Sequence, residues 1–395
     1  MPAAPESVPA PPRLSLAALL PPEELAAEVA AGRVRRTRHP DPALPLSVYA
    51  YGPQCVFANH WTPVTRRARG LVVDDESGEV VALTFPKFFN YDQHQAGSPF
   101  APELPHGEPF EVFDKLDGSL GIVFHYGGRW HAATKSAFAS EQALWAQAWL
   151  AARDTAGLTP GTTYLAEIIY PRNRIVVDNG DRKGLVLLGA FAADGTELPL
   201  SSCADAWRSL GGDVVAAHPA PPLDTLVRHA RADLGLDGRP VSGTEAEGWV
   251  VRFASGLRVK VKSADYVRLH GAMSRTTERG VWEVLSAGDD PAVLFDRMPD
   301  EFRAWILDTA NRLRAAHQAW TAAAEAAYAQ VLAAEAETGT DARPDRPAFA
   351  RLAAAHPREV RSALFLLYDG RPIDALAWRH IKPAAGAPFI TADAG

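Results

Sequence analysis

The stretch Glu111-Val-Phe-Asp-Lys-Leu-Asp-Gly-Ser-Leu120 joins an apolar strand pattern to a lysine, a carboxylate and a Gly-Ser pair. On an extended segment Lys115 and Asp117 project to the same face, and Gly118 lets the backbone pass close to a ligand. A lysine is a nucleophile only when its amine is neutral, which needs nearby positive charge, a metal ion or desolvation. Asp117 alone would favour the charged amine, so it suits this chemistry if it holds a divalent cation. Because Asp-Gly is also a common turn pair, the stretch by itself fits a surface turn equally well.

Strand signals surround this stretch from about residue 47 to about residue 270. Turn residues between apolar runs predict three hairpins, which join 70–74 to 79–84, 121–126 to 129–134, and 249–253 to 257–261. The pair Gly127-Gly128 is the turn signal of the second hairpin. Further strands are expected at 110–114, 164–170, 175–177 and 185–191, and a helix is expected at 141–152.

Helical spacing replaces strand alternation on both sides of this region. Residues 1–20 are expected to be disordered or weakly held, and a short helix is expected within 22–38, ending near Gly32. A basic run follows that fits a solvated linker or an RNA contact equally well: Arg33, Arg35, Arg36 and Arg38. Ala-rich helical spacing covers 275–335, Gly and Pro break it at 338–347, and a last helical stretch covers 347–367. The chain is therefore predicted to be α+β, with a tail and short helix at 1–40, a main domain at 41–270 and an all-α domain at 271–395.

Composition narrows the class of protein. The net charge of −7 argues against a protein that coats nucleic acid by bulk charge, but not against an enzyme that grips phosphates in one groove. Two cysteines far apart, Cys55 and Cys203, suit a reducing cytoplasm better than secretion. No apolar run approaches the roughly 18 residues of a membrane span, and the N-terminus lacks the pattern of a signal peptide. We therefore expect a cytoplasmic protein without a membrane partner.

Five further blocks accompany Lys115-Leu-Asp-Gly-Ser119 in order along the chain. They are Arg69-Gly-Leu-Val72, Pro86-Lys-Phe-Phe-Asn90, Tyr164-Leu-Ala-Glu167 with Pro171-Arg-Asn-Arg-Ile-Val176, Glu247-Gly-Trp-Val-Val251, and Lys260-Val-Lys-Ser263 with Tyr266 and His270. Together the blocks resemble the motifs of covalent nucleotidyltransferases, and in particular of the bacteriophage T4 RNA ligase 1-like enzymes. The resemblance covers residues 67–270, over half the chain. It implies an adenylation domain of antiparallel sheets with flanking helices.

The same resemblance implies a reaction and a set of site residues. Lys115 would attack ATP and carry AMP, which passes to a 5′-phosphate RNA end that a 3′-hydroxyl then attacks. The other implied catalytic residues are Asp117, Glu247, Lys260 and Lys262. The implied nucleotide-binding residues are Arg69, Lys87, Phe89, Gly118, Lys135, Glu167, Gly248, Trp249 and Tyr266. Asp117, Glu167 and Glu247 would organise Mg²⁺ (or Mn²⁺), through water because Mg²⁺ keeps several of its waters.

These residue types suit phosphoryl transfer, in which a protein mainly positions groups and neutralises charge. Lys260 and Lys262 share one face of a strand, where they would stabilise charge on the α-phosphate and lower the pKa of Lys115. Glu167 and Glu247 lie on apolar strands, where a carboxylate needs a partner.

Each assignment has a plainer structural alternative. For Lys260 and Lys262 it is a solvated edge strand, and for Glu167 and Glu247 it is a salt bridge to a structural arginine. Three further residues fit ordinary structural roles as well as nucleotide contacts: Lys135 as an exposed lysine, Trp249 as core and Tyr266 as helix packing.

One departure from the wider superfamily narrows the branch. DNA ligases and capping enzymes carry an arginine two residues after the glycine of the Asp-Gly pair, where this chain has Leu120. They also continue into a strand-rich oligonucleotide-binding barrel, whereas this chain turns helical. Both points favour an RNA ligase over those enzymes, and an inactive nucleotide- or RNA-binding relative is a further alternative. We expect an RNA partner, conceivably a tRNA, and an end-healing kinase or phosphatase as a second one.

The helical domain lies outside the motif blocks. By analogy with the T4-like enzymes it would contribute to RNA preference. Four of its arginines are candidate RNA contacts, although arginines on Ala-rich helices also fit a solvated face: Arg303, Arg312, Arg314 and Arg351.

Overall fold

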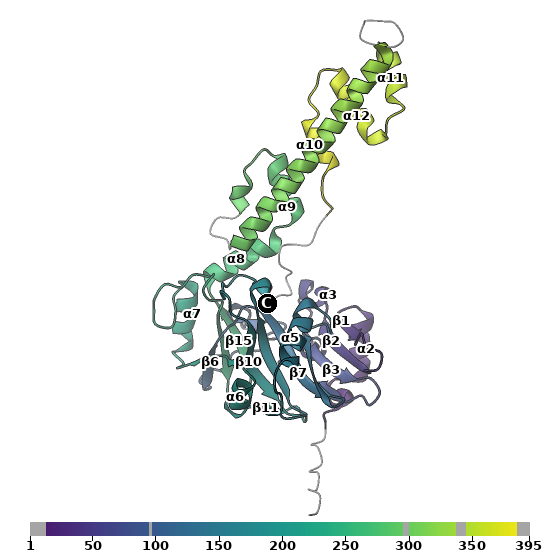
Figure 1. Cartoon of the computed structure of the whole chain (residues 1–395). Helices are drawn as coiled ribbons and strands as arrows, with labels where there is room; N and C mark the ends of the chain where they lie inside the picture. The colour runs from purple at the N-terminus through teal and green to yellow at the C-terminus, as the bar shows by residue number, and fades with distance from the viewer. Residues whose placement is uncertain (1–12, 95–96, 295–299, 337–344, 385–395) are drawn as a thin grey trace, which may run out of the picture. The chain divides into compact units, whose positions relative to one another are not determined.

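The computed structural model describes residues 13–94, 97–294, 300–336 and 345–384. Contacts along the chain divide it into two units, the first ending at Arg268 and the second beginning at Leu269. The first unit contains three β-sheets with helices, and the second is helical, as the ribbon in Figure 1 shows. The α+β prediction with a helical C-terminal region is therefore confirmed, while the proposed domain boundaries at 41 and 270 remain a prediction.

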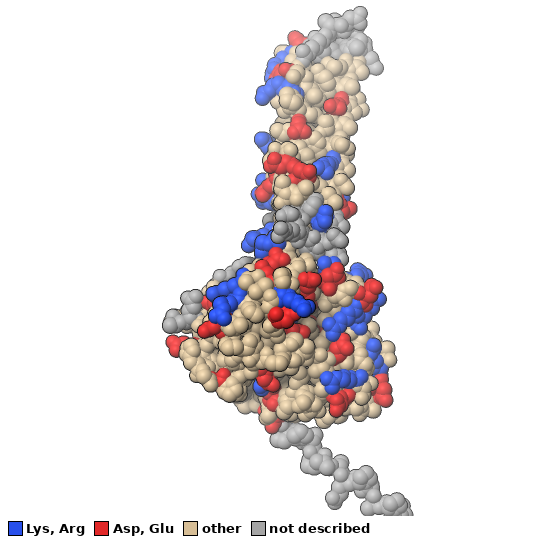
Figure 2. All heavy atoms as spheres, turned by 90° about the vertical axis from the view of Figure 1, so that its left-hand side faces the viewer, with Lys and Arg blue, Asp and Glu red and all other residues tan. Residues whose placement is uncertain are grey.

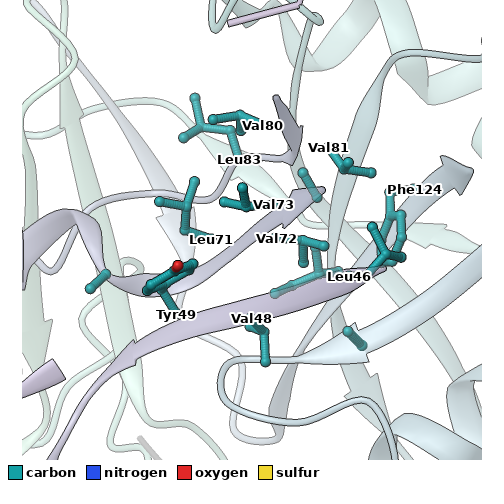
Figure 3. Close-up of a cluster of buried hydrophobic side chains, with 14 of the residues drawn as sticks. Leu46, Val48, Tyr49, Leu71, Val72, Val73, Val80, Val81, Leu83 and Phe124 are labelled. Carbon is teal, nitrogen blue, oxygen red and sulfur yellow. The ribbon is translucent and has the colours of Figure 1, made fainter. Parts of the chain in front are cut away.

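The first sheet is antiparallel and has the order β1 (Val34–Arg38), β2 (Leu46–Tyr51), β3 (Arg69–Asp74) and β4 (Val80–Ala82). The pairing of β3 with β4 confirms the first predicted hairpin. Every residue of β2 is buried, because this strand is central and covered on both faces. Figure 3 shows the aliphatic side chains of β2, β3 and β4 gathered in one cluster with Phe124.

The second sheet contains six strands: β7 (Ser119–Tyr126), β8 (Arg129–Thr134), β9 (Thr163–Ile169), β10 (Gly184–Phe191), β11 (Glu197–Leu198) and β12 (Asp213–Val214). Gly127 and Gly128 connect β7 to β8 with φ angles of 55° and 77°, which confirms the second hairpin. Strand β7 alternates between two cores. Phe124 faces the cluster of the first sheet, whereas Val123 faces helices α5 (Glu141–Ala151) and α6 (Leu200–Ser209).

The third sheet has the order β13 (Ala217–His218), β6 (Phe110–Asp114), β14 (Gly248–Phe253), β15 (Arg258–Lys262) and β5 (Phe89–Asn90). Pairing of β14 with β15 confirms the third hairpin. Helix α7 (Leu223–Arg231) covers one face of this sheet, where Trp249, Val251 and Val259 are buried against it. Because strand side chains alternate, Val250, Lys260 and Lys262 lie on the opposite face.

The N-terminal part of the first unit is more ordered than predicted. Residues 1–12 lie outside the described residues, but residues 13–20 were wrongly expected to be loose: Leu16–Leu19 form helix α1, and Leu20 is buried. Helix α2 (Pro22–Ala30) ends before Gly32, as predicted. The basic run is not a linker, because Val34–Arg38 form strand β1, which pairs with β2. Two arginines of the run also form ion pairs, Arg33 with Glu28 and Arg36 with Asp75. The remaining short elements are α3 (Pro53–Phe57), α4 (Pro63–Arg67) and the 3₁₀ turns Tyr91–Gln93 and Pro171–Asn173.

The second unit is built on a long helix, α10 (Asp300–Ala336). Its other helical elements are the end of α8 (Ala264–Arg275), α9 (Glu278–Ser286), the 3₁₀ turn Pro291–Leu294, α11 (Arg346–Ala353), α12 (Arg358–Tyr368) and α13 (Asp374–His380). The expected single helix at 347–367 is two helices, because Pro357 interrupts the chain and caps α12. Of the predicted Gly/Pro break at 338–347, residues 338–344 lie outside the described residues. Among the described residues, no helix combines the length and the apolar character needed to cross a bilayer.

We expect Phe124→Ala to destabilise the first unit by about 3–5 kcal/mol, because the side chain is 1% exposed and its loss leaves a cavity between two sheets. Amide hydrogen exchange of peptides from β7 and β9, followed by mass spectrometry, measures this loss in the intact chain. Leu144→Ala on α5 is the matched control, since Leu144 is 57% exposed and should change stability by less than about 0.5 kcal/mol. Equal exchange in the two variants would contradict this account of the core.

Candidate active site

Lys115 lies at the end of β6 and meets a carboxylate from the neighbouring strand. Its backbone N–H donates to the carbonyl of Gly248 at 2.9 Å, which continues the pairing of β6 with β14. The Nζ atom of Lys115 is 2.7 Å from Oε1 of Glu247, and the Nζ atom of Lys262 is 2.8 Å from the same oxygen. Glu247 is 1% exposed, so two lysines from two strands share one buried carboxylate.

Gly248 makes this arrangement possible. In a regular strand Glu247 would fall on the same face as Trp249, which is buried against α7. Gly248 has a φ of 130°, in the region that side-chain-bearing residues rarely adopt, and this turns Glu247 toward the lysines. A Cβ at this position would also collide with the carbonyl oxygen of Val261 and lie 2.9 Å from Cα of Lys262.

Asp117 is held by three hydrogen bonds. The backbone N–H groups of Val176 and Val177 each donate to Oδ2 at 2.7 Å, and the hydroxyl of Tyr266 donates to Oδ1 at 2.7 Å. The strand expected at 175–177 is therefore wrong, because these amides bind a side chain instead of a neighbouring strand. Burial and the nearby Glu247 raise the pKa of Asp117, against the hydrogen bonds that lower it. Burial likewise raises the pKa of Tyr266, so its hydroxyl stays a donor.

Glu167 lies on β9, opposite Leu120 of β7. Gly118 passes directly over it: a Cβ on Gly118 would lie 3.0 Å from Cγ of Glu167 and 2.6 Å from the carbonyl of Ile168. Burial raises the pKa of Glu167 to about 8, because Glu247 and Asp117 add to the effect and Lys115 only partly offsets it. A cation placed beside Glu167 would therefore stabilise the ionised form of its carboxylate.

Asp117, Glu167 and Glu247 therefore gather around Lys115, as each affects the pKa of the lysine. Within the described ranges, no group of three His, Cys, Asp or Glu side chains is arranged to hold a metal ion directly. The acceptors fit a hydrated cation nevertheless: Glu167 is buried beside two other carboxylates, and Oδ1 of Asp117 accepts only one of the two bonds it can take. Water-mediated binding of a divalent metal stays a prediction.

Positive side chains line the other side of Lys115. Lys260 is buried, and its Nζ atom lies 5.2 Å from the ring centroid of Phe88, on which the guanidinium of Arg69 also lies at 5.9 Å. Burial lowers the pKa of Lys260 well below its usual range, and Lys87, Lys115 and Lys262 lower it further. No carboxylate of the described residues forms an ion pair with Lys260, Lys87 or Arg69. Partly desolvated cations without a counter-ion form a site for a bound anion.

Aromatic rings separate these cations from one another. The Nζ atom of Lys87 lies 5.0 Å from the ring of Trp61 and 5.7 Å from the ring of Tyr51, and Lys135 lies 5.0 Å from the same Tyr51 ring. Burial lowers the pKa of Lys87, to which Arg69, Lys135 and Lys262 contribute. The rings hold the ammonium group of Lys87 by cation–π attraction without neutralising its charge, so this charge stays available to a ligand.

Two predicted nucleotide-binding residues lie in the core. Phe89 is 2% exposed and contacts Trp61 and Phe100, and Trp249 is 8% exposed beneath α7. Their contact with a nucleotide stays a prediction. The half-buried Phe88 lies next to Arg69 and Lys260 instead, and the sequence analysis missed it. The signal is the strand register, because Asn90 pairs with Lys260 and places Phe88, two residues earlier, on the same face.

An α+β scaffold that buries a lysine between carboxylates and cations without carboxylate partners is the arrangement expected of a nucleotidyltransferase. Comparison with known proteins agrees. The family model of T4 RNA ligase 1-type RNA ligases matches residues 67–266, half of the chain, and the chain belongs to this RNA ligase family. The sequence-based recognition of this family is thereby confirmed.

The individual proteins that the chain resembles match it over short regions or with low sequence identity. A protein of Autographa californica nuclear polyhedrosis virus, named as a bifunctional polynucleotide kinase/RNA ligase, is 38% identical over 82 residues, which are 20% of this chain and 12% of the viral protein. A Naegleria gruberi RNA ligase variant solved with ATP and Mn is 19% identical over 42% of this chain and 52% of its own, with a TM-score of 0.34. An Aquifex aeolicus protein named as an ATP-dependent DNA ligase is 14% identical over 73% and 70%, with a TM-score of 0.42. The chain thus spans about an eighth of the viral relative and about half of the Naegleria structure.

If the site reacts with ATP as the family resemblance implies, we expect Gly248→Ala to reduce covalent labelling of the chain by ATP at least tenfold, the scale of one lost electrostatic contact, because Glu247 would be displaced from both lysines. Labelling of the protein with α-³²P-ATP and a divalent metal measures this loss. Gly256→Ala is the matched control in the same hairpin, since Gly256 also has a positive φ, of 85°, but open space around a Cβ. It should show the backbone strain without the loss of labelling, and an equal loss in both variants would contradict the role given to Gly248.

Proposed function

We propose that this RNA ligase joins 5′-phosphate and 3′-hydroxyl RNA ends with ATP, through a lysyl-AMP intermediate on Lys115 and an RNA-adenylate. The observation that carries the proposal is the position of the Lys115 amine between buried carboxylates and buried cations that have no carboxylate partner. Such a position suits an amine that reacts with a phosphate bound by those cations.

In the first step Nζ of Lys115 would attack the α-phosphorus of ATP. A P–N bond forms, the bond from the α-phosphorus to the bridging oxygen breaks, and pyrophosphate leaves. Lys260 and Lys262 would stabilise charge on the α-phosphate, while Arg69, Lys87 and Lys135 would hold the departing phosphates. The amine must release a proton, and Oε1 of Glu247, at 2.7 Å, is the acceptor within reach.

The carboxylates set the protonation state of the nucleophile. Burial alone would lower the pKa of Lys115, but Glu247 and Glu167 outweigh it, so the pKa is raised and the amine is charged. Asp117, Glu167 and Glu247 would hold Mg²⁺ or Mn²⁺ through water, and when bound the metal supplies positive charge that opposes this effect. The metal requirement of the proposed reaction thus follows from the electrostatics of the lysine.

In the second step AMP passes from Lys115 to the 5′-phosphate of RNA, and in the third the 3′-hydroxyl attacks that phosphate and releases AMP. The family and Leu120 favour RNA over DNA. Acidic and basic side chains are mixed over the face shown in Figure 2, so we expect RNA to be gripped locally rather than by bulk charge. The helical unit would contribute RNA preference, with tRNA as one candidate.

The proposed reaction needs RNA ends with a 5′-phosphate and a 3′-hydroxyl, which another enzyme would have to prepare. A kinase or phosphatase would have to supply 5′-phosphates and 3′-hydroxyls from damaged RNA, consistent with a repair role. The viral relative is named as both a polynucleotide kinase and an RNA ligase, although the match to it covers only 82 residues. Both cysteines are free and buried, which fits the reducing cytoplasm.

The central test is covalent labelling of the protein. We expect α-³²P-ATP with Mg²⁺ to label the wild-type chain and the label to disappear in Lys115→Ala, because the neutral amine at this position forms the P–N bond. Lys183→Ala removes an exposed lysine outside the site and should label normally. Absence of label on the wild-type chain at any pH would refute the proposal. Preference for DNA over RNA ends in a sealing assay would refute the RNA assignment alone.

A second test uses the pH dependence of labelling. The amine attacks only when neutral, so the rate rises as pH rises through the pKa of Lys115. Glu247 raises that pKa, so Glu247→Gln should move the rise to lower pH while reducing the maximal rate at least tenfold. Single-turnover labelling between pH 6 and about 10 measures both quantities. Glu103→Gln, an exposed carboxylate outside the site, should change neither, and an unshifted profile in Glu247→Gln would remove Glu247 from control of the nucleophile.

A further inference from the structure

Two arginines beside the proposed nucleotide site have no role in the reaction described so far. Arg66 and Arg67 end helix α4, and both are half-buried. Neither forms an ion pair with any carboxylate of the described residues. The Nε atom of Arg66 is buried without a hydrogen-bond acceptor. Burial lowers the pKa of both guanidinium groups, and Arg66 adds to the effect on Arg67.

Several half-buried or buried arginines of the first unit are paired with carboxylates: Arg33 with Glu28 at 2.5 Å, and Arg252 and Arg258 with Glu197 at 2.9 and 2.5 Å. Arg66 and Arg67 instead resemble Arg69, which also forms no ion pair within the described residues and has a buried guanidinium nitrogen without a hydrogen-bond acceptor. Partly buried guanidinium groups without an acid lose hydration and repel each other, so an external anion bound near both would stabilise them.

The two arginines are connected to the proposed phosphate-binding residues. The backbone N–H of Lys87 donates to the carbonyl of Arg66 at 2.7 Å. The guanidinium of Arg66 lies 5.6 Å from the ring centroid of Phe89, and Nζ of Lys87 lies 5.9 Å from the same centroid. Arg66 and Lys87 therefore lie near the same aromatic ring, so the arginine pair and the proposed phosphate-binding residues are neighbours.

We propose that Arg66 and Arg67 form a second phosphate site, adjacent to that of Lys87, which binds the terminal phosphate of a substrate. Planar guanidinium forks bind phosphate oxygens in pairs, which suits a terminal phosphoryl group with three free oxygens. Two substrates of the proposed ligase present this group: ATP at its γ-phosphate and RNA at its 5′ end. This inference rests on the proposed function and extends it to two residues outside the motifs.

Variants separate the two sources, with the double variant Arg66→Ala/Arg67→Ala assayed in the full chain. If the site holds the γ-phosphate, the KM for ATP in lysyl-AMP formation rises at least tenfold, while AMP transfer from pre-labelled enzyme to 5′-phosphorylated RNA is unchanged. If it holds the RNA end, labelling is unchanged and AMP transfer falls at least tenfold. Arg66→Lys/Arg67→Lys keeps the charge and should lose less than the alanine variant. The control is Arg129→Ala, an exposed arginine in the β7–β8 turn region, and double-variant values within twofold of it in both steps would overturn the proposal.

A measurement on the wild-type protein keeps the test independent of folding and of catalysis. Phenylglyoxal modifies accessible guanidinium groups, and mass spectrometry reads modification at Arg66 and Arg67. We expect protection by ATP or by a 5′-phosphorylated oligoribonucleotide, according to the source, but not by AMP or by the 5′-hydroxyl oligoribonucleotide. Equal modification with all four would overturn the second phosphate site even if Lys115 is labelled. Protection without labelling of Lys115 would instead leave the anion site standing and refute the ligase chemistry.

Discussion

A single carboxylate oxygen, Oε1 of Glu247, lies within 2.8 Å of two lysine ammonium groups, and the rest of the site depends on it. Burial would raise the pKa of Glu247, but Lys115 and Lys262 outweigh burial and hold it below its usual range. The triad needs three strands in fixed register, because Lys115 follows β6, Glu247 precedes β14 and Lys262 ends β15. Removing Glu247 would leave two ammonium groups without their buried carboxylate, which costs about 3–5 kcal/mol.

Apart from the ion pairs of Glu247 with Lys115 and Lys262, the carboxylates and most of the cations of the site are not paired with each other within the described residues. Asp117 and Glu167 lie on the side of the second sheet, whereas Lys260, Lys87 and Arg69 form no ion pair with a carboxylate of the described chain. The pKa of Glu167 is raised and that of Lys260 is lowered, so the surroundings of each group disfavour its charged form. A metal ion beside Glu167 and a polyphosphate beside Lys260, as proposed, would each stabilise the ionised form of its neighbour, so the two ligands would favour each other's binding.

The sequence predicted much of this arrangement, for identifiable reasons. Hairpins with glycine turns and alternating strands depend on local chemistry, so β3–β4, β7–β8 and β14–β15 were found at the expected places. Residues 175–177 were misassigned because their apolar side chains indicate a strand, while their amides bind Asp117, about 60 residues earlier in the chain. Phe88 was passed over because its register is visible only when distant strands are in place. From the sequence, Arg66 and Arg67 are expected to face solvent or RNA, and their half-burial without a carboxylate partner among the described residues is visible only in the folded chain.

The hydrogen bonds that hold Asp117 also determine when the site can form. Its partners Val176 and Tyr266 lie 59 and 149 residues further along the chain. Contacts of such long separation close large loops and form late, after the local hairpins. During synthesis Lys115 and Asp117 would therefore emerge, and the β7–β8 hairpin that follows them would form, well before the Asp117 carboxylate is anchored. The competence to react with a nucleotide would arise in one late event, once the polypeptide has been made as far as the first turn of α8.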